Sequence, residues 1–145
     1  MRMASKTHFA ILAGLTGLFA LRVAGQAIQR WAPQAWLPAF DDFQGSSLGY
    51  STLLTIQLLI LGLMTRTTWR VGRGIAQPSH RLGRGLAWFG GIYMAGSVLR
   101  ILVGLIVANA HPWFSTWIPA LFHLLLAGFV IAAAAFHLRH SERAQ

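Results

Sequence analysis

Arginine, glutamine and histidine side chains occur inside the most apolar stretches of this sequence. Arg22 and Arg100 each stand in such a stretch, and Gln57 and His123 stand in two others. A guanidinium group can hold a carboxylate, a phosphate or the carbonyl oxygen of a quinone. An imidazole can exchange a proton near neutral pH, which arginine cannot do. These residue types predict a site for the polar head of an amphiphile, with His123 as its hydrogen-bond or proton donor.

The four positions fall at a similar depth if each apolar stretch is a helix that crosses a bilayer. With a rise of about 1.5 Å per residue, Arg22 and Arg100 lie about 20 and 21 Å from the start of their segments. Gln57 lies about 10 Å, and His123 roughly 9 to 14 Å, from the opposite face. We therefore predict one polar layer, roughly a third of the way in from the outer face.

Helical spacing favours an inward orientation for these polar side chains. Two polar stripes follow the helical period: Arg22, Gln26 and Gln29 on the first segment, and Tyr93, Ser97, Arg100 and Gly104 on the third. Two alternatives remain open for each arginine. Its long side chain could extend to the lipid headgroups, or it could contact a partner subunit.

Two acidic residues are candidates to balance these cations. Asp41 and Asp42 lie in segment 29–49, which is rich in aromatic residues but too short to span. In this segment the spacing of three aromatic residues predicts a short interfacial helix: Trp36, Phe40 and Phe43. We expect the segment to fold over the mouth of the bundle and to bring one carboxylate toward Arg22 or Arg100. The alternative is that both acids simply face water.

The elements that must position these residues are four apolar segments in one domain of 145 residues. The predicted spans are 9–27, 50–65, 86–108 and 113–138. They predict an all-α integral membrane four-helix bundle, with an interfacial or re-entrant segment at 29–49 and a basic cytoplasmic loop at 66–85. Repeated small residues, such as Gly90 with Gly91 and the alanines from Ala132 to Ala135, predict close helix packing.

The positive charge follows the predicted topology. The net charge is +9, and one side of a four-span arrangement would carry Arg2, Lys6, Arg66, Arg70, Arg73, Arg81, Arg84, Arg139 and Arg143. The other side would carry Arg30. By the positive-inside rule both termini are cytoplasmic, and we expect a bacterial inner membrane. This distribution favours contact with anionic lipid headgroups over binding of nucleic acid.

Several kinds of redox and metal chemistry are disfavoured. The chain has no cysteine, which excludes thiol redox chemistry and disulfides. Haem between His8 and His137 is disfavoured because both lie at the basic ends of their segments. His111 with His123 is a weaker pair. A metal ion on His123 with Asp41 or Asp42 would be repelled by the arginines, so we expect no metal site.

Three functions remain open at this stage. The first is binding of an anionic or carbonyl-bearing amphiphile, such as a lipid or a quinone, at a site formed by Arg22, Gln26, Asp41, Asp42, Gln57, Arg100 and His123. The second is a non-catalytic accessory subunit that binds a membrane protein partner or a second copy of the chain. The third is membrane enzyme chemistry at His123 with Asp41 or Asp42, which would need a substrate carbonyl or ester near both.

Overall fold

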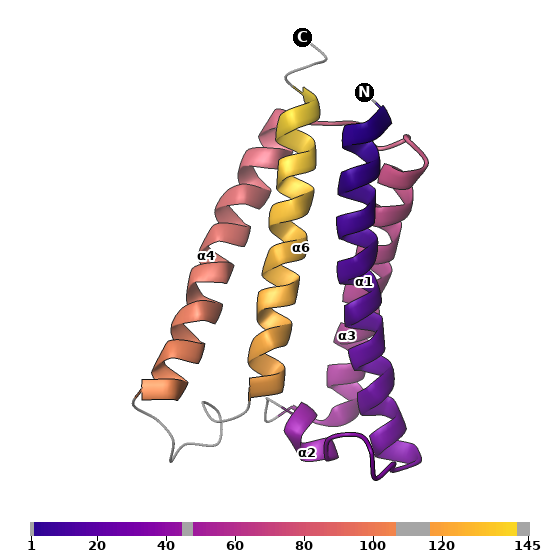
Figure 1. Ribbon diagram of the computed structural model, residues 1–145, viewed down its shortest axis with the longest axis vertical. Helices are drawn as coiled ribbons and strands as arrows, with labels where there is room; N and C mark the ends of the chain where they lie inside the picture. The colour runs from indigo at the N-terminus through magenta and orange to yellow at the C-terminus, as the bar shows by residue number, and fades with distance from the viewer. Residues whose placement is uncertain (1, 45–47, 107–116, 142–145) are drawn as a thin grey trace.

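In the computed structural model the described chain is all-α (Figure 1). The described residues are 2–44, 48–106 and 117–141. Four long helices run α1 (Arg2–Trp31), α3 (Tyr50–Gly72), α4 (His80–Ile106) and α6 (Trp117–Ser141). A four-residue helix, α2 (Phe40–Phe43), lies between α1 and α3. The predicted outer turn that contains His111 lies outside the described residues.

Three described helices are long and apolar enough to cross a membrane. These candidate spans are Lys6–Trp31, His80–Gly104 and Ile118–Ser141. They indicate a membrane protein, because an apolar helix of about 20 residues matches the hydrocarbon core of a bilayer. The predicted span at 50–65 is helical, but α3 is not among these three.

The helices pack in the order α3, α1, α6, α4. Helix α4 packs on α6, and α1 packs on both α3 and α6. In the described residues α3 and α4 share no extensive interface, although the chain connects them directly. The beginning of α1 and the end of α6 lie at the same end of the molecule, with α6 between α4 and α1 (Figure 1).

Helices α3 and α4 both extend into the region that the sequence predicted to be a basic loop with at most short helical extensions of its neighbours. Residues 66–72 continue α3 and α4 begins at His80, so the link between the two helices is confined to residues 73–79. The helix ends where Gly74 adopts φ +70° and the amide of Ile75 donates to Arg70 O (3.0 Å). Ser79 then precedes α4, and its amide donates to Nδ1 of His137 (3.2 Å). This contact ties the link to α6.

The outer segment contains less helix than expected. Helix α1 continues to Trp31 and stops before Pro33, whose ring cannot continue a helix. Only Phe40–Phe43 is helical, so Trp36 lies outside α2 and is exposed. Phe43 is buried against Gly25, where a Cβ atom would lie 3.6 Å from the ring. The segment is thus attached to α1 by the buried Phe43, while the indole of Trp36 is exposed.

The main cluster of buried apolar residues is formed by α1, α3 and α6. The core consists of Leu12, Phe19, Val23, Met64, Val71, Phe129, Ala133 and Phe136. Helix α4 instead approaches α6 through small residues spaced seven apart, namely Gly83, Gly90, Ser97 and Gly104, all buried. A Cβ atom on Gly90 would lie 2.9 Å from Cγ1 of Ile131, so this close approach requires glycine. Gly91, by contrast, is exposed.

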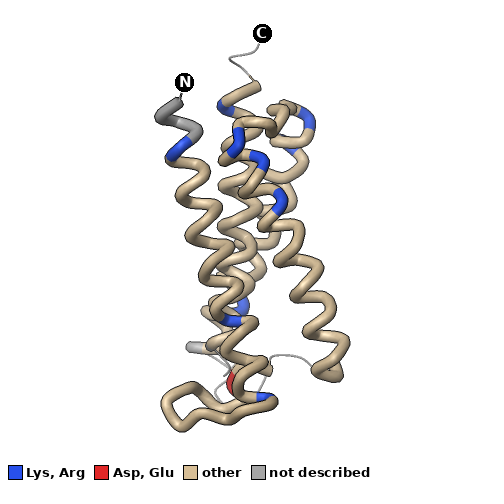
Figure 2. Tube along the Cα trace, turned by 90° about the vertical axis from the view of Figure 1, so that its right-hand side faces the viewer, with Lys and Arg blue, Asp and Glu red and all other residues tan. Residues whose placement is uncertain are grey.

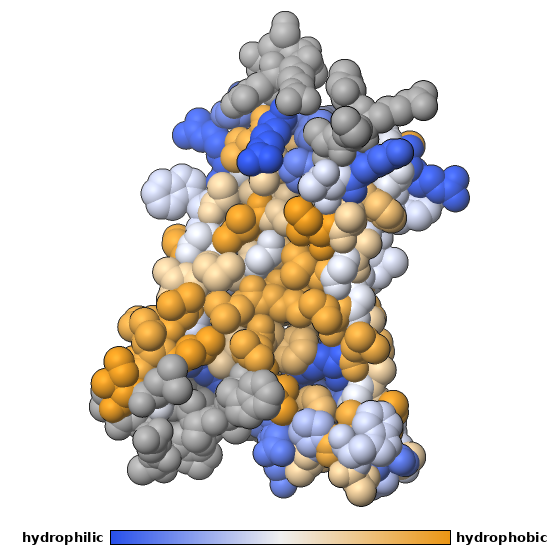
Figure 3. Space-filling view, in the orientation of Figure 1, coloured by the Kyte–Doolittle hydropathy of each residue, from blue (hydrophilic) through white to orange (hydrophobic). Residues whose placement is uncertain are grey.

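Charge is distributed unevenly along the molecule. Lysine and arginine gather at the end where α1 begins and α6 ends, and the described acidic residues lie toward the opposite end (Figure 2). Apolar side chains form a broad band between these ends (Figure 3). We call the first end the basic end and the other the α2 end.

Candidate functional site

A cavity of about 280 Å³ lies near the α2 end. It lies between two halves of the fold, one formed by α1 and α3 and the other by α4 and α6. Its polar lining residues come from all four long helices: Arg22, Gln57, Tyr93 and His123. Its apolar lining includes Phe19, Ile56, Ile60, Pro119, Phe122 and Leu126. Three of the residues predicted to share one depth therefore meet at one cavity. In Figure 3 a hydrophilic patch interrupts the apolar band in the same half of the molecule.

Arg22 is held by α2 and α6. Its Nη2 donates to the carbonyl oxygen of Phe43 (2.8 Å), and its Cζ lies 4.6 Å from the ring centroid of Phe122. A charged hydrogen bond and a cation–π contact both stabilise a guanidinium that is taken out of water. The side chain is half-buried against protein.

Arg22 contacts a backbone carbonyl and not the carboxylate that the sequence predicted. Asp41 and Asp42 are both exposed, and Oδ2 of Asp42 accepts from the amide of Ala39 (3.1 Å). No ion pair joins Arg22 to either aspartate among the described residues. The reason is local, because burial of Phe43 turns its own carbonyl toward Arg22 while the two preceding side chains point outward. The guanidinium charge is thus met by a neutral oxygen.

Gln26 and Gln57 join α1 to α3 at the wall of the cavity. Nε2 of Gln57 donates to Oε1 of Gln26 (3.2 Å), and both side chains are buried. Nε2 of Gln26 and Oε1 of Gln57 have no hydrogen-bond partner in the described residues. Gln57 lines the cavity and Gln26 does not. The amide of Gln57 is therefore a polar group at the cavity with one hydrogen bond unmade.

His123 pairs with a residue that the prediction left out of the site. The hydroxyl oxygen of Tyr93 lies 2.6 Å from Nδ1 of His123, which joins α4 to α6. The hydroxyl of Ser97 donates to the carbonyl oxygen of Tyr93 (2.8 Å). Tyr93 belongs to the polar stripe on the third segment, so the helical period could have identified it. His123 with Asp41 or Asp42 does not form a pair, because both carboxylates are exposed on α2.

Arg100 is buried on α4 but does not line the cavity. Of the two predicted arginines, Arg22 is therefore the one at the cavity. Within the described residues the acidic side chains lie away from it, on the exposed face of α2.

Gln29 and the histidines at the basic end have structural roles. Gln29 donates through Nε2 to Pro38 O (2.7 Å), and its Oε1 accepts from the amide of Gln34 (2.6 Å), so it holds the outer segment. At the basic end the rings of His8 and His140 lie 5.4 Å apart, and Nδ1 of His137 accepts from Ser79. In the described residues no group of three or more His, Cys, Asp or Glu is placed to hold a metal ion.

Comparisons with known proteins give no relative for this chain. No protein-family model matches it, and neither a curated protein nor a solved structure is significantly similar. The chemistry of the cavity is therefore the basis for a functional argument.

Proposed function

We propose that this chain is a polytopic membrane protein that binds the polar head of an anionic or carbonyl-bearing amphiphile, such as a lipid or a quinone. The head would occupy the cavity lined by Arg22, Gln57, Tyr93 and His123. The observation that carries this proposal is a guanidinium at a cavity between apolar helices with a neutral carbonyl, and no carboxylate, beside it among the described residues. A buried charge is stabilised strongly when an opposite charge or further hydrogen bonds reach it.

The lining supplies a role for each polar group. Nε of Arg22 is buried and has no hydrogen-bond partner in the described part of the chain, so it can donate to a ligand oxygen. Nε2 of Gln57 donates one N–H to Gln26, and its second N–H can donate to a ligand oxygen, whereas the unpaired Oε1 can only accept. When the hydroxyl of Tyr93 donates to Nδ1 of His123, the Nε2–H of the imidazole is a further donor. The apolar residues of the cavity suit the first part of an acyl or prenyl chain.

The proposal includes a topology in which all four long helices cross the bilayer. Helix α3 is less apolar than the others, but from Tyr50 to Trp69 it extends about 28 Å, close to the hydrocarbon thickness. Aromatic residues at both ends of that stretch suit the two interfaces. The basic end would face the cytoplasm of a bacterial cell, with the cavity toward the outer leaflet.

Ligand-dependent thermal unfolding of the purified protein tests the binding proposal. Dodecanoate, a quinone with a decyl chain and dodecanol share a similar tail but differ in the head. We expect the first or second to raise the melting temperature well above the effect of dodecanol, because a ligand at 100 times its Kd adds about 2.7 kcal/mol. The shift should be lost in Gln57→Leu and His123→Leu.

A matched control is Thr16→Val, which removes a polar contact between α1 and α3 elsewhere. Oγ1 of Thr16 lies 3.1 Å from Oγ1 of Thr68, and neither residue lines the cavity. This variant should keep the ligand-dependent shift even if its own melting temperature falls. Equal shifts for dodecanol and dodecanoate, or a full shift in Gln57→Leu and His123→Leu, would contradict the proposal.

Introduced cysteines test the topology, because the chain has none of its own. In intact cells an impermeant thiol reagent should label Gln34→Cys in the outer segment and should not label Gln77→Cys in the α3–α4 link. Labelling of both from outside would exclude the four-span arrangement proposed here.

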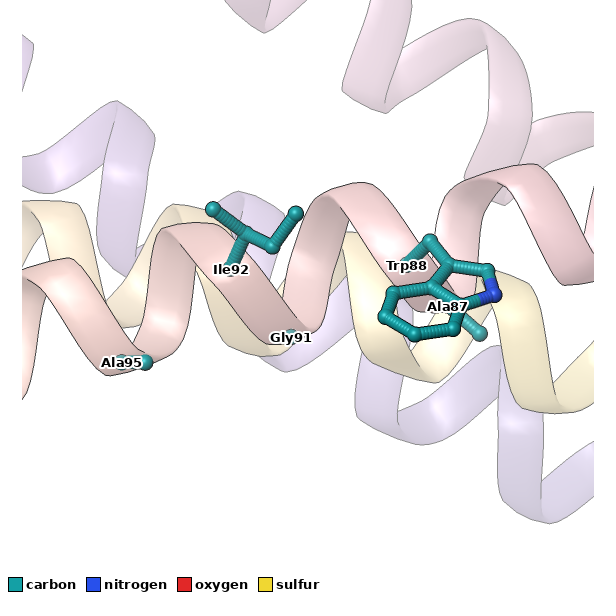
Figure 4. Close-up of a pocket in the computed structure, with 5 residues that line it drawn as sticks. All are labelled: Ala87, Trp88, Gly91, Ile92 and Ala95. Atoms are coloured by element: carbon teal, nitrogen blue, oxygen red, sulfur yellow. The ribbon is translucent and has the colours of Figure 1, made fainter.

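A second candidate function is that of a non-catalytic accessory subunit. It is favoured by the outer face of α4, where a shallow groove is lined by Ala87, Trp88, Gly91, Ile92 and Ala95 (Figure 4). Small residues four apart allow two membrane helices to approach closely. In that case Gly91→Leu should release a stoichiometric protein partner, while dodecanoate and the quinone should cause no selective shift.

A further inference from the structure

A second groove lies on the outer face of α3, away from the cavity, and its chemistry changes along the helix. Its lining residues are Leu58, Leu61, Gly62, Thr65, Arg66 and Trp69. The part nearer the middle of the helix is apolar, and the part nearer the basic end carries a hydroxyl, a guanidinium and an indole. The groove thus has the polarity profile of a lipid, with a tail portion and a head portion.

The length of the apolar portion fits one leaflet. From Leu58 to Arg66 the helix rises about 12 Å, which compares with about 15 Å for half of the hydrocarbon core. Gly62 forms the floor of this portion, and a Cβ atom there would meet nothing within 4 Å. A single acyl chain can therefore lie along α3 in the indentation that the missing side chain leaves.

The head portion is cationic and aromatic. Arg66 lines the groove, and Cζ of Arg73 lies 5.7 Å from the ring centroid of Trp69. Trp69 is half exposed, as is typical of an indole at the interface between lipid and water. One arginine in the groove and a second against its indole give this end of the groove a positive charge that suits a phosphate.

Among the described residues no acidic side chain lies near these arginines. The described aspartates, Asp41 and Asp42, are on α2, at the opposite end of the molecule. No described carboxylate therefore neutralises Arg66, and the anionic headgroups of a bilayer have the charge that this end of the groove attracts.

We propose that this groove binds one anionic phospholipid from the leaflet at the basic end. The acyl chain lies over Leu58, Leu61 and Gly62, and the phosphate contacts Arg66 beside Trp69. The site is on a different face of α3 from Gln57 and does not depend on ligand binding in the cavity, but it rests on the proposed topology in which α3 crosses the bilayer. It also differs from general attraction to the surface, because one groove fixes both the tail and the head.

Native mass spectrometry of the protein, extracted from bilayers of equal amounts of phosphatidylglycerol and phosphatidylcholine with identical chains, tests this proposal. We expect retained phosphatidylglycerol in excess. Arg66→Gln should lower the ratio of the two retained lipids roughly fivefold, the effect of one basic residue at an anionic surface. Gly62→Leu should lower total retention with no change of charge, because leucine fills the indentation.

Matched controls lie on the exposed face of α4. Arg84→Gln removes the same charge at the same end of the molecule, and Gly96→Leu adds the same bulk to another exposed helical glycine. Both should retain lipid as the unmodified chain does. The two test variants act on different parts of the groove, so either one decides the question if the other fails to fold.

Three outcomes would overturn the proposal. Equal retention of the two lipids would remove the selectivity for an anion. An effect of Arg84→Gln as large as that of Arg66→Gln would show diffuse attraction instead of a site. Unchanged retention in Gly62→Leu would show that no chain occupies the groove.

Discussion

The hydroxyl of Tyr93 lies 2.6 Å from Nδ1 of His123, across the interface between α4 and α6. Both residues line the cavity, and Arg22 of α1 lines it as well. This hydrogen bond connects the half of the fold that contains α4 and α6 to the chemistry of the cavity. It also fixes the orientation of the only imidazole there among the described residues.

Tyr93→Phe should destabilise the fold and free the imidazole of His123. The expected loss is about 0.6 to 2 kcal/mol, the range for one interhelical hydrogen bond in a membrane protein. Thermal unfolding in detergent measures it, and ¹⁵N shifts of His123 should show a change in the tautomer ratio.

Tyr50→Phe is the matched control for that substitution. The hydroxyl of Tyr50 is buried and has no hydrogen-bond partner in the described residues. Its removal should therefore be neutral or slightly stabilising, because an unmade buried hydrogen bond already carries a desolvation cost. A larger loss for Tyr50→Phe than for Tyr93→Phe would contradict this account.

Arg22→Gln should release α2 from the bundle, because the bond from Nη2 to Phe43 O and the contact with Phe122 are both lost. Hydrogen exchange of the amides in residues 40–44 should accelerate, since Arg22 hydrogen-bonds the end of α2, and the rings of Phe40 and Phe43 would then hold it alone. Arg30→Gln is the control, because Arg30 is exposed and lies 5.8 Å from the ring of Phe40. Equal acceleration in both variants would exclude a specific role of Arg22.

The losses of unfolding free energy in Gln26→Leu and Gln57→Leu should add up to more than the loss in the double variant. Either single change leaves a buried amide without its partner, at about 1 to 3 kcal/mol. The double variant replaces both polar groups by apolar ones, so a double-mutant cycle should give a coupling energy of about 0.5 to 3 kcal/mol. Strict additivity would mean that the 3.2 Å bond between them contributes nothing.

Gly90→Ala and Gly91→Ala should have different effects on the stability of the fold, although the two residues are adjacent. A Cβ atom on Gly90 would lie 2.9 Å from Cγ1 of Ile131 and 3.4 Å from a backbone nitrogen, so α4 must shift away from α6. The expected cost is about 1 to 3 kcal/mol, as for overpacking of a core. On Gly91 nothing lies within 4 Å, and alanine should be neutral or stabilising by up to about 1 kcal/mol. Thermal unfolding of the two variants, compared side by side, gives the answer directly, and similar losses would contradict the packing described here.

The sequence by itself determined the four helical segments and the position of the polar residues along each helix. Apolar stretches of this length satisfy their backbone hydrogen bonds internally, and the helical rise then sets where Arg22, Gln57 and His123 lie along each helix. It did not determine where α3 ends. The glycines and the proline between residues 66 and 85 predicted a loop with at most short helical extensions, whereas the helix continues as far as Gly72.

Only the tertiary structure decided which groups meet. The rotation and order of the helices place Tyr93 on His123, separate α3 from α4, and give Arg22 the carbonyl of Phe43 instead of a carboxylate. These contacts depend on the close approach of α4 to α6 at Gly90 and on the burial of Phe43 beside Gly25. Helical periodicity specifies the face on which a side chain lies, but a neighbour is specified only when two faces pack together.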